Sequence, residues 1–346
     1  MVFFQRYKKS FSSIFMLVVF LLAMTACQPL NSPYLDKSSN LKVVATTTII
    51  GDVVSQIGGD AIELTVLLPS GSDPHTFEPT PRDIVALSDA DVVFINGFGL
   101  EEFLDRFLET NIEVERVVVV SDGIQPRRFV DSNVHSHDEH KDDHVYGDDQ
   151  THEEEHGHEE DQENGDDHDH GEYDPHVWFD VNNVIVWTGN IERQLSALDP
   201  DNASLFTENA ENYRQRLEEL DAAIVEQVSQ IPVENRKLVS DHESFGYFAD
   251  RYGFQQLATV IPNISTAAAP SAQDLAKLID IIKESGAKAI FVGTTVNPEI
   301  SRRIAEDTDI KLGMLYTGSL SEPGGPASSY IDMMRYNVNL IVSALK

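Results

Sequence analysis

The sequence has a single cysteine, two tryptophans and few basic residues for its length of 346 residues. One cysteine cannot form an intramolecular disulfide, so the stability of the fold must come from its apolar core. Lysine and arginine number 25 against 58 aspartate and glutamate residues, which leaves a formal net charge of −33. Nucleic acid and anionic membrane surfaces are therefore excluded as partners, because their own negative charge repels such a chain.

Long apolar runs are also missing, except for one near the N-terminus. Ile14–Met24 is apolar, follows the basic residues Arg6, Lys8 and Lys9, and is short for a membrane span. A basic end followed by a short apolar run is typical of an export signal. We therefore expect a signal peptide over residues 1–26.

The signal ends directly before the cysteine. Met24, Thr25 and Ala26 precede Cys27, in a pattern that resembles a bacterial lipoprotein cleavage site. We expect Cys27 to be lipidated and residues 27–40, rich in Ser, Asn and Pro, to form a flexible tether. The alternative is a plain signal peptide with an incidental cysteine. The lipid would anchor the exported protein to the bacterial membrane, in the periplasm or at the cell surface.

Short apolar runs alternate with helical patterns in both halves of the remaining chain, which is typical of parallel sheets covered on both faces. The expected strands are Lys42–Thr47, Ile62–Leu68, Val92–Asn96, Val117–Val120, Lys237–Ser240, Gln256–Val260, Ala289–Val292 and Lys311–Tyr316. The expected helices are Gly51–Ile57, Arg82–Asp89, Glu101–Glu109, Ser271–Glu284, Pro298–Glu306 and Ala327–Leu345.

A longer helix is predicted between the two halves. Asp199-Pro200 and Ile231-Pro232 mark its ends. Its apolar residues are spaced three, four or eight apart: Leu205, Tyr213, Leu217, Leu220, Ile224 and Val228. We predict an α/β fold of two lobes, each with a mostly parallel sheet flanked by helices, joined by one long rigid helix. The expected boundaries are 41–200 for the N-terminal lobe, 201–231 for the linking helix and 232–346 for the C-terminal lobe.

Nine of the twelve histidines lie in one acidic stretch, residues 131–174, which also holds nineteen acidic residues and one lysine. Such a segment has too few apolar residues to fold alone, so we expect a disordered loop. Imidazoles among carboxylates favour weak, exchangeable capture of metal ions. A passive acidic spacer is the alternative.

The other three histidines lie in short motifs: His75 in SDPHTFEP, His176 in DPHVWFD and His242 in SDHESFGYF. Each is expected in a loop at a strand–helix junction, where open α/β sheets place their ligand sites. Two belong to the first half and one to the second, so a shared ion would lie between the lobes. Three imidazoles supply most of a tetrahedral Zn²⁺ shell and leave one position open.

Together the motifs DPHTFEPTP (73–81), DPHVWFD (174–180) and HESFGYF (242–248) resemble the zinc/manganese solute-binding lipoproteins of bacterial ABC importers. The resemblance extends from about Leu41 to the C-terminus. It implies two lobes, a metal ion in the cleft between them, and delivery to a membrane permease and, through it, an ATPase. It also implies that His75, His176 and His242 bind the ion, and it favours zinc, with manganese as the alternative.

One position departs from that family. Gly318 stands where many relatives have an aspartate ligand, so the fourth ligand would be water or a carboxylate such as Glu322 or Asp73.

We expect a monomeric, non-enzymatic protein that captures Zn²⁺ and passes it to its importer. A manganese or iron binder of the same class is the first alternative. A zinc hydrolase is a second, with Glu243 as general base, although neither HExxH nor Gly-x-Ser-x-Gly occurs. A surface adhesin or metal buffer is a third.

Overall fold

The computed structural model describes residues 40–104, 116–129, 173–261, 266 and 269–346. The signal peptide, Cys27, most of the tether and most of the acidic loop therefore lie outside the described residues. Leu41–Lys346 forms one compact unit. Within the described residues, no helix is long and apolar enough to cross a membrane.

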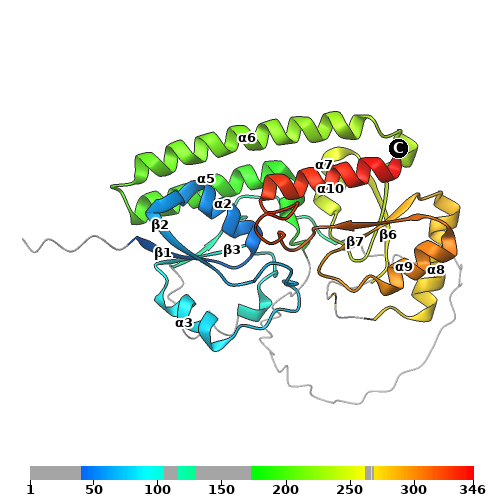
Figure 1. Ribbon diagram of the computed structural model, residues 1–346, viewed down its shortest axis with the longest axis horizontal. Coiled ribbons are helices and arrows are strands. Elements are labelled where there is room, and N and C mark those ends of the chain that lie inside the picture. Colours follow the sequence, from blue (N-terminus) through cyan, green and yellow to red (C-terminus); the bar gives the residue numbers. More distant parts are fainter. Residues whose placement is uncertain (1–39, 105–115, 130–172, 262–265, 267–268) are drawn as a thin grey trace, which may run out of the picture. The chain divides into compact units, whose positions relative to one another are not determined.

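Two four-stranded sheets organise this unit, in the orders β2-β1-β3-β4 and β6-β5-β7-β8, and all their strands are parallel (Figure 1). The prediction of two parallel sheets is thus confirmed. The first sheet consists of β1 Leu41–Ala45, β2 Ile62–Val66, β3 Val92–Ile95 and β4 Val117–Val119. The second consists of β5 Lys237–Ser240, β6 Gln255–Thr259, β7 Ala289–Gly293 and β8 Lys311–Leu315.

Helices cover both sheets, and most begin and end where the sequence supplies capping residues. Thr80 with Asp83, and Ser271 with Asp274, form capping boxes at the starts of α3 and α8. The helices are α2 Thr48–Gly58, α3 Pro81–Asp89, α5 Val181–Leu198, α6 Ala203–Ser229, α7 Gly246–Tyr252, α8 Ala272–Ser285, α9 Glu299–Thr308 and α10 Tyr330–Leu345, with single 3₁₀ turns η1 Gly59–Ala61, η3 Val177–Phe179 and η4 Val233–Asn235. Of the predicted helix Glu101–Glu109, residues after Leu104 lie outside the described part.

The strands are apolar on both faces because each sheet separates two hydrophobic clusters. Val43 in β1 packs into the large central core, whereas its neighbour Val44 packs into a smaller cluster on the opposite face. Leu238 and Val239 in β5 divide in the same way. The central core includes residues of both sheets and of α5, α6 and α10, so a single apolar interior joins the two halves.

Helix α6 is the long helix that the sequence predicts, and its 27 residues span about 40 Å. Figure 1 shows it running beside α5 and past both sheets. Its buried residues are spaced three or four apart: Phe206, Ala210, Tyr213, Leu217, Leu220, Ile224 and Val228. The sequence predicts Leu205 in this stripe, but Leu205 is 41% exposed. Steps of three and four residues towards the N-terminus from Tyr213 lead to Ala210 and Phe206, so these two residues face the core instead.

A second connection between the sheets runs from β8 to α10, across the start of α2. The N–H of Leu320 donates to Thr48 Oγ1 at 2.9 Å, and the N–H of Gly71 donates to Ser319 Oγ at 2.9 Å. The N–H of Tyr330, the first residue of α10, donates to Asp52 Oδ2 in α2 at 2.9 Å. The predicted lobes are therefore tied together by more than the long helix.

Several predicted boundaries were wrong. Helix α2 begins at Thr48 rather than Gly51, because the side chain of Thr47 accepts from the N–H of Ile50. The C-terminal helix begins at Tyr330 rather than Ala327, because Ser329 is the residue whose side chain accepts from the N–H of Asp332. The predicted disordered loop also extended too far, to residue 174. Tyr173 pairs with Arg128 in an antiparallel bridge, and Asp174 is fully buried, so the chain is ordered at these two residues.

Candidate metal centre

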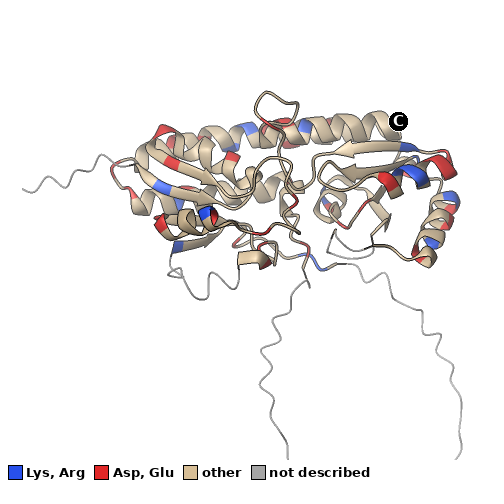
Figure 2. Cartoon of the chain, turned by 60° about the horizontal axis from the view of Figure 1, so that its bottom comes forward, with Lys and Arg blue, Asp and Glu red and all other residues tan. Residues whose placement is uncertain are grey.

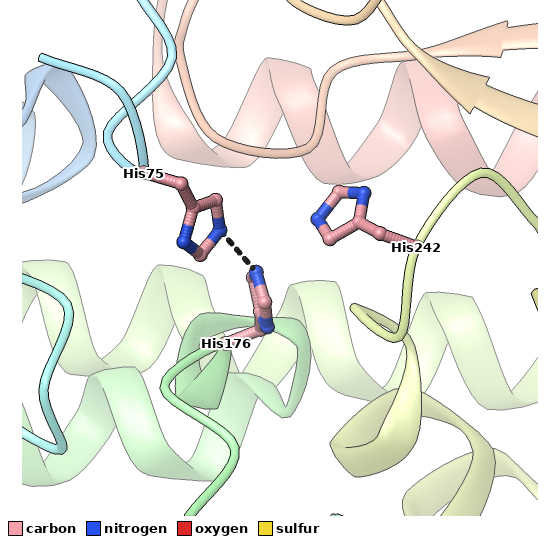
Figure 3. A group of neighbouring side chains, drawn as sticks. All are labelled: His75, His176 and His242. Carbon is pink, nitrogen blue, oxygen red and sulfur yellow. Dashed lines mark hydrogen bonds between the residues drawn. The ribbon is translucent and has the colours of Figure 1, made fainter. Parts of the chain in front are cut away.

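Three loops carry the histidines that lie outside the acidic segment. His75 lies between β2 and α3, and His242 lies between β5 and α7, so both follow the carboxyl ends of parallel strands. His176 lies directly before η3, at the start of the turn that leads into α5. Figure 3 shows the three rings pointing toward a common centre from these separate loops.

The rings are close enough to share one ion. The Nε2 atoms of His75 and His176 are 3.1 Å apart. The ring centroids are 5.1 Å apart for His75 and His176, 5.6 Å for His75 and His242, and 5.2 Å for His176 and His242. One ring nitrogen from each lies within 4.8 Å of the other two. Two ligands at 2.0–2.1 Å from a tetrahedral ion lie about 3.3 Å apart, so the residues fit a metal ion with little movement.

The centre is shielded from solvent. His176 is 2% exposed and His242 is 3% exposed, whereas His75 is half-buried. The indole of Trp178 lies against His176 with ring centroids 5.3 Å apart, and its Nε1 donates to the carbonyl of Thr317 at 2.9 Å. An ion held here would lose most of its hydration shell, so its affinity depends on the donor atoms of the protein.

Aspartates orient the imidazoles. Asp174 Oδ1 accepts from the backbone N–H of His176 at 3.0 Å and from its Nδ1 at 2.8 Å. Asp241 Oδ1 accepts from the N–H of His242 at 2.8 Å and from its Nδ1 at 2.9 Å. An ionised carboxylate can only accept, so the Nδ1 atoms of His176 and His242 carry hydrogens, and in each neutral ring the Nε2 lone pair is left for the ion. Such carboxylate–histidine pairs are typical of metal sites.

The electrostatic environment favours neutral imidazoles at two of the three positions. Burial, reinforced by the other two histidines, lowers the pKa of His75 well below its usual value. Burial likewise lowers the pKa of His176. Burial alone would lower the pKa of His242 as well, but the charge and the hydrogen bond of Asp241 outweigh it and raise that pKa. His75 and His176 are thus ready to bind a cation at neutral pH, whereas His242 keeps its proton to a higher pH than a free imidazole does.

The orienting carboxylates also differ in their pKa. Burial would raise the pKa of Asp241, but His242 and the N–H of Gly293, which donates to Oδ2 at 2.7 Å, hold it below its usual value. Burial raises the pKa of Asp174 to about 7, although the N–H of His176 and the charges of Arg127 and His242 act in the opposite direction. Its Oδ2 has no hydrogen-bond partner among the described residues.

No carboxylate of the described residues joins the three rings as a further ligand. Asp73 accepts from the N–H of His75 at 3.0 Å through one oxygen and from Thr266 Oγ1 at 2.6 Å through the other. Glu322 is exposed. A Cβ at Gly318 would lie 2.8 Å from Pro74 Cδ, so the residue before His75 occupies the space that a side chain at position 318 would need.

Sequence reasoning found the three histidines but assigned no role to Asp174 and Asp241. A signal was present, since an aspartate stands two residues before His75 and His176 and one before His242. Arg127, which lies beside Asp174, was not identified, and no local pattern marks it. Glu243, the candidate base of a hydrolase, pairs with Arg127 at 3.3 Å and is not part of the histidine group.

Comparisons with known proteins found a matching family and solved structures of similar fold. Residues 43–344 match the family described as zinc-uptake complex component A, periplasmic (ZnuA). The chain is 33% identical to the manganese-binding lipoprotein MntA of Halalkalibacterium halodurans, over 96% of this chain and 97% of that protein. The periplasmic zinc-binding protein TroA of Treponema pallidum has a TM-score of 0.71 at 27% identity, over 89% of this chain and 99% of TroA. The Mn-bound periplasmic metal-binding protein of Candidatus Liberibacter asiaticus has a TM-score of 0.71 at 25% identity, over 88% of this chain and 99% of that one.

Proposed function

Because the chain belongs to the ZnuA family of periplasmic zinc-uptake components, we propose that it captures Zn²⁺ through His75, His176 and His242. Members of this family are metal-binding, substrate-binding proteins of ABC importers and not enzymes, so the partners of this chain are a permease and its ATPase. The ion is the transported substrate.

The donor set supports zinc. Three imidazoles, two of them buried, provide nitrogen ligands, and no carboxylate of the described residues adjoins them, whereas Mn²⁺ prefers carboxylate, carbonyl and water oxygens. The close approach of Pro74 to Gly318 supports the same conclusion, because it leaves no room for a carboxylate from that position. The fourth ligand in this proposal is water.

Manganese is the second candidate, and the names of relatives favour it. The relative that is 33% identical is named as a manganese-binding lipoprotein, and one solved structure of similar fold is Mn-bound. Two relatives that share about a third of their residues can prefer different metals when their ligands differ. The preference of this chain for zinc or manganese therefore depends on its own ligands.

The test is the metal content of protein purified without added metal, followed by competition between Zn²⁺ and Mn²⁺. We expect about one zinc per chain, bound tightly enough to exclude Mn²⁺ in large excess. His176→Ala should abolish this binding, whereas His168→Ala, which removes a histidine of the acidic segment, should retain it. Retention of tight zinc by His176→Ala would overturn the assignment. Uptake assays in cells lacking the protein would then identify the physiological ion.

We also propose that Cys27 is lipidated and holds the mature protein at the membrane. Relatives of this chain are named lipoproteins, and the residues before Cys27 resemble their processing site. Mass spectrometry of the membrane-associated protein would show a diacylglyceryl addition at Cys27, and Cys27→Ser should release the protein into the soluble fraction. A protein that remained soluble with an unmodified cysteine would contradict the anchor.

A further inference from the structure

Arg127 connects the two halves of the molecule next to the histidine centre. It belongs to the segment that follows β4, and its side chain is 16% exposed. Its Nε donates to Asp250 Oδ2 in α7 at 3.1 Å, and its Nη1 donates to Glu243 Oε1 at 3.3 Å. Its backbone N–H donates to the hydroxyl of Tyr247, also in α7, at 2.9 Å. Three hydrogen bonds therefore join Arg127 to Glu243, which directly follows His242, and to two residues of α7.

The same guanidinium faces the carboxylate that orients His176. Nη1 of Arg127 lies 3.7 Å from Asp174 Oδ2, a buried oxygen without a hydrogen bond among the described residues. The backbone carbonyl of Arg127 accepts from the N–H of Asp174 at 2.7 Å. Arg127 thus contacts both the partner of one candidate ligand and the neighbour of another.

The backbone of α7 packs closely against Arg127 and Asp174. A Cβ at Gly246, the first residue of α7, would lie 2.4 Å from Arg127 Nη1 and 2.6 Å from Asp174 Oδ2. The start of α7 therefore rests directly on the guanidinium and on the carboxylate. Separation of α7 from the first sheet would break the contacts of Arg127 with Glu243, Tyr247 and Asp250 together.

We infer that Arg127 is a positioning residue that latches α7 to the Asp174–His176 pair and thereby slows release of the bound ion. This inference rests on the proposed function, since it concerns the same site. The contact with Glu243 carries most of the effect, because Glu243 is only 22% exposed, whereas the carboxylate of Asp250 is 70% exposed and screened by water.

The test compares zinc dissociation rates of purified full-length variants, measured by chelator competition in a stopped-flow instrument. Arg127→Gln should release zinc about tenfold faster or more. The association rate should change little, because the contacts of Arg127 hold the site together around an ion that is already bound. Arg127→Lys keeps the charge and should restore part of the retention. Cobalt(II) in place of zinc should report the change as an altered visible spectrum, since His176 loses its fixed orientation.

Two arginines provide matched controls. Arg128→Gln removes the same charge from the adjacent position, where the guanidinium stacks on Tyr173 at 5.4 Å. Arg251→Gln removes an anchor of α7 that pairs with Asp221 and Asp180 and does not contact Asp174. Both should leave the dissociation rate within about twofold of the unaltered protein.

A second test changes Glu243, the partner of Arg127, instead of Arg127 itself. Glu243→Gln should accelerate release, and the double variant Arg127→Gln/Glu243→Gln should release zinc no faster than Arg127→Gln alone, because both lose the same contact. The proposed role of Arg127 would be overturned by an unchanged zinc dissociation rate in folded Arg127→Gln. It would also be overturned if Arg251→Gln accelerated dissociation equally. Unaltered protein that binds no metal would overturn the proposed function instead.

Discussion

At the scale of single residues, each histidine is oriented by its own neighbourhood in the sequence. Asp174 and Asp241 each accept from both the backbone N–H and the ring Nδ1 of the histidine that follows them. The spacing of one or two residues suffices, because a short carboxylate side chain folds back onto the next N–H groups. The tautomers of His176 and His242 are therefore set by residues next to them in the sequence.

Proton release on zinc binding follows from these pairs. The pKa of His242 is raised above its usual value, and burial raises the pKa of Asp174 to about 7. Zinc displaces the proton of His242 and favours ionised Asp174, so affinity should fall as the pH drops through these pKa values. We expect zinc binding to release more protons at pH 6 than at pH 8.5, in calorimetry across buffers of different ionisation enthalpy.

Asp241→Asn provides the control for this pH dependence. Without the carboxylate, the pKa of His242 should fall, and the loss of affinity should move to lower pH. Affinity at pH 8 should itself drop by about 10–100-fold, because the ring loses its orienting partner. A release of three protons near pH 6 would show that His75 or His176 is also protonated, contrary to the lowered pKa of each.

At the scale of elements, loops and one helix set the distances between the residues of the site. The loop after β8 rests against Pro74 at Gly318, and its next residues bond to Gly71 and Thr48. The missing side chain at position 318 thus allows the loop that carries His75 to approach the second half of the molecule.

Gly318→Ala tests this close approach. The added Cβ would lie 2.8 Å from Pro74 Cδ, so the loop that carries His75 must move away, and zinc affinity should fall about tenfold. Gly189→Ala in α5 is the matched control, because a Cβ there has nothing within 4 Å. That control should keep full affinity and gain about 0.5–1 kcal/mol of unfolding free energy. Equal zinc affinity in calorimetry of the two variants would refute the packing argument.

Helix α6 provides a stability prediction. Leu217 is fully buried in the central core, whereas Val225 on the same helix is 49% exposed. Leu217→Ala should reduce the free energy of unfolding of metal-free protein by about 2–5 kcal/mol, through lost transfer energy and a cavity. Val225→Ala should change it by less than about 0.5 kcal/mol. Urea unfolding followed by circular dichroism measures both, and a similar loss in the two variants would contradict the assigned face of α6.

At the scale of the whole molecule, two parallel sheets deliver the histidines to one place. His75 and His242 follow β2 and β5, and parallel strands place such residues at the carboxyl edge of their sheets. The central core extends through both sheets and α6, so the two edges are held in a defined relation. Acidic residues (red) are spread over helices of both halves in Figure 2, with basic residues (blue) among them.

Removal of the acidic segment tests whether this folded centre works by itself. A variant that lacks residues 131–172 keeps Tyr173 and Asp174, which are ordered, and loses all nine clustered histidines. We expect one tight zinc per chain in calorimetry of this variant, with only weak additional sites lost. Failure of the shortened but folded protein to bind zinc would place the tight site in the segment instead of at the three rings.

Much of the fold and the candidate ligands could be predicted from the sequence. Alternation of apolar runs and helical patterns predicted both sheets, because strands buried on two faces must be apolar throughout. The three motifs predicted His75, His176 and His242, because each histidine stands beside local turn and aspartate residues. Periodicity predicted α6 but misplaced Leu205. Leu205 and Phe206 are adjacent apolar residues, and the spacing alone does not show which of them faces the core.

Other features arose only in the tertiary structure. The contacts of Arg127 with Asp174 and Glu243, and of Gly318 with Pro74, join residues that are 47 to 244 positions apart. The raised pKa of Asp174 likewise comes from its burial by surrounding elements. Local sequence therefore determined which residues could bind an ion and which aspartates accept from the rings of His176 and His242. The packing of two sheets on one core decided that the three rings meet, because only chain folding sets distances between remote segments.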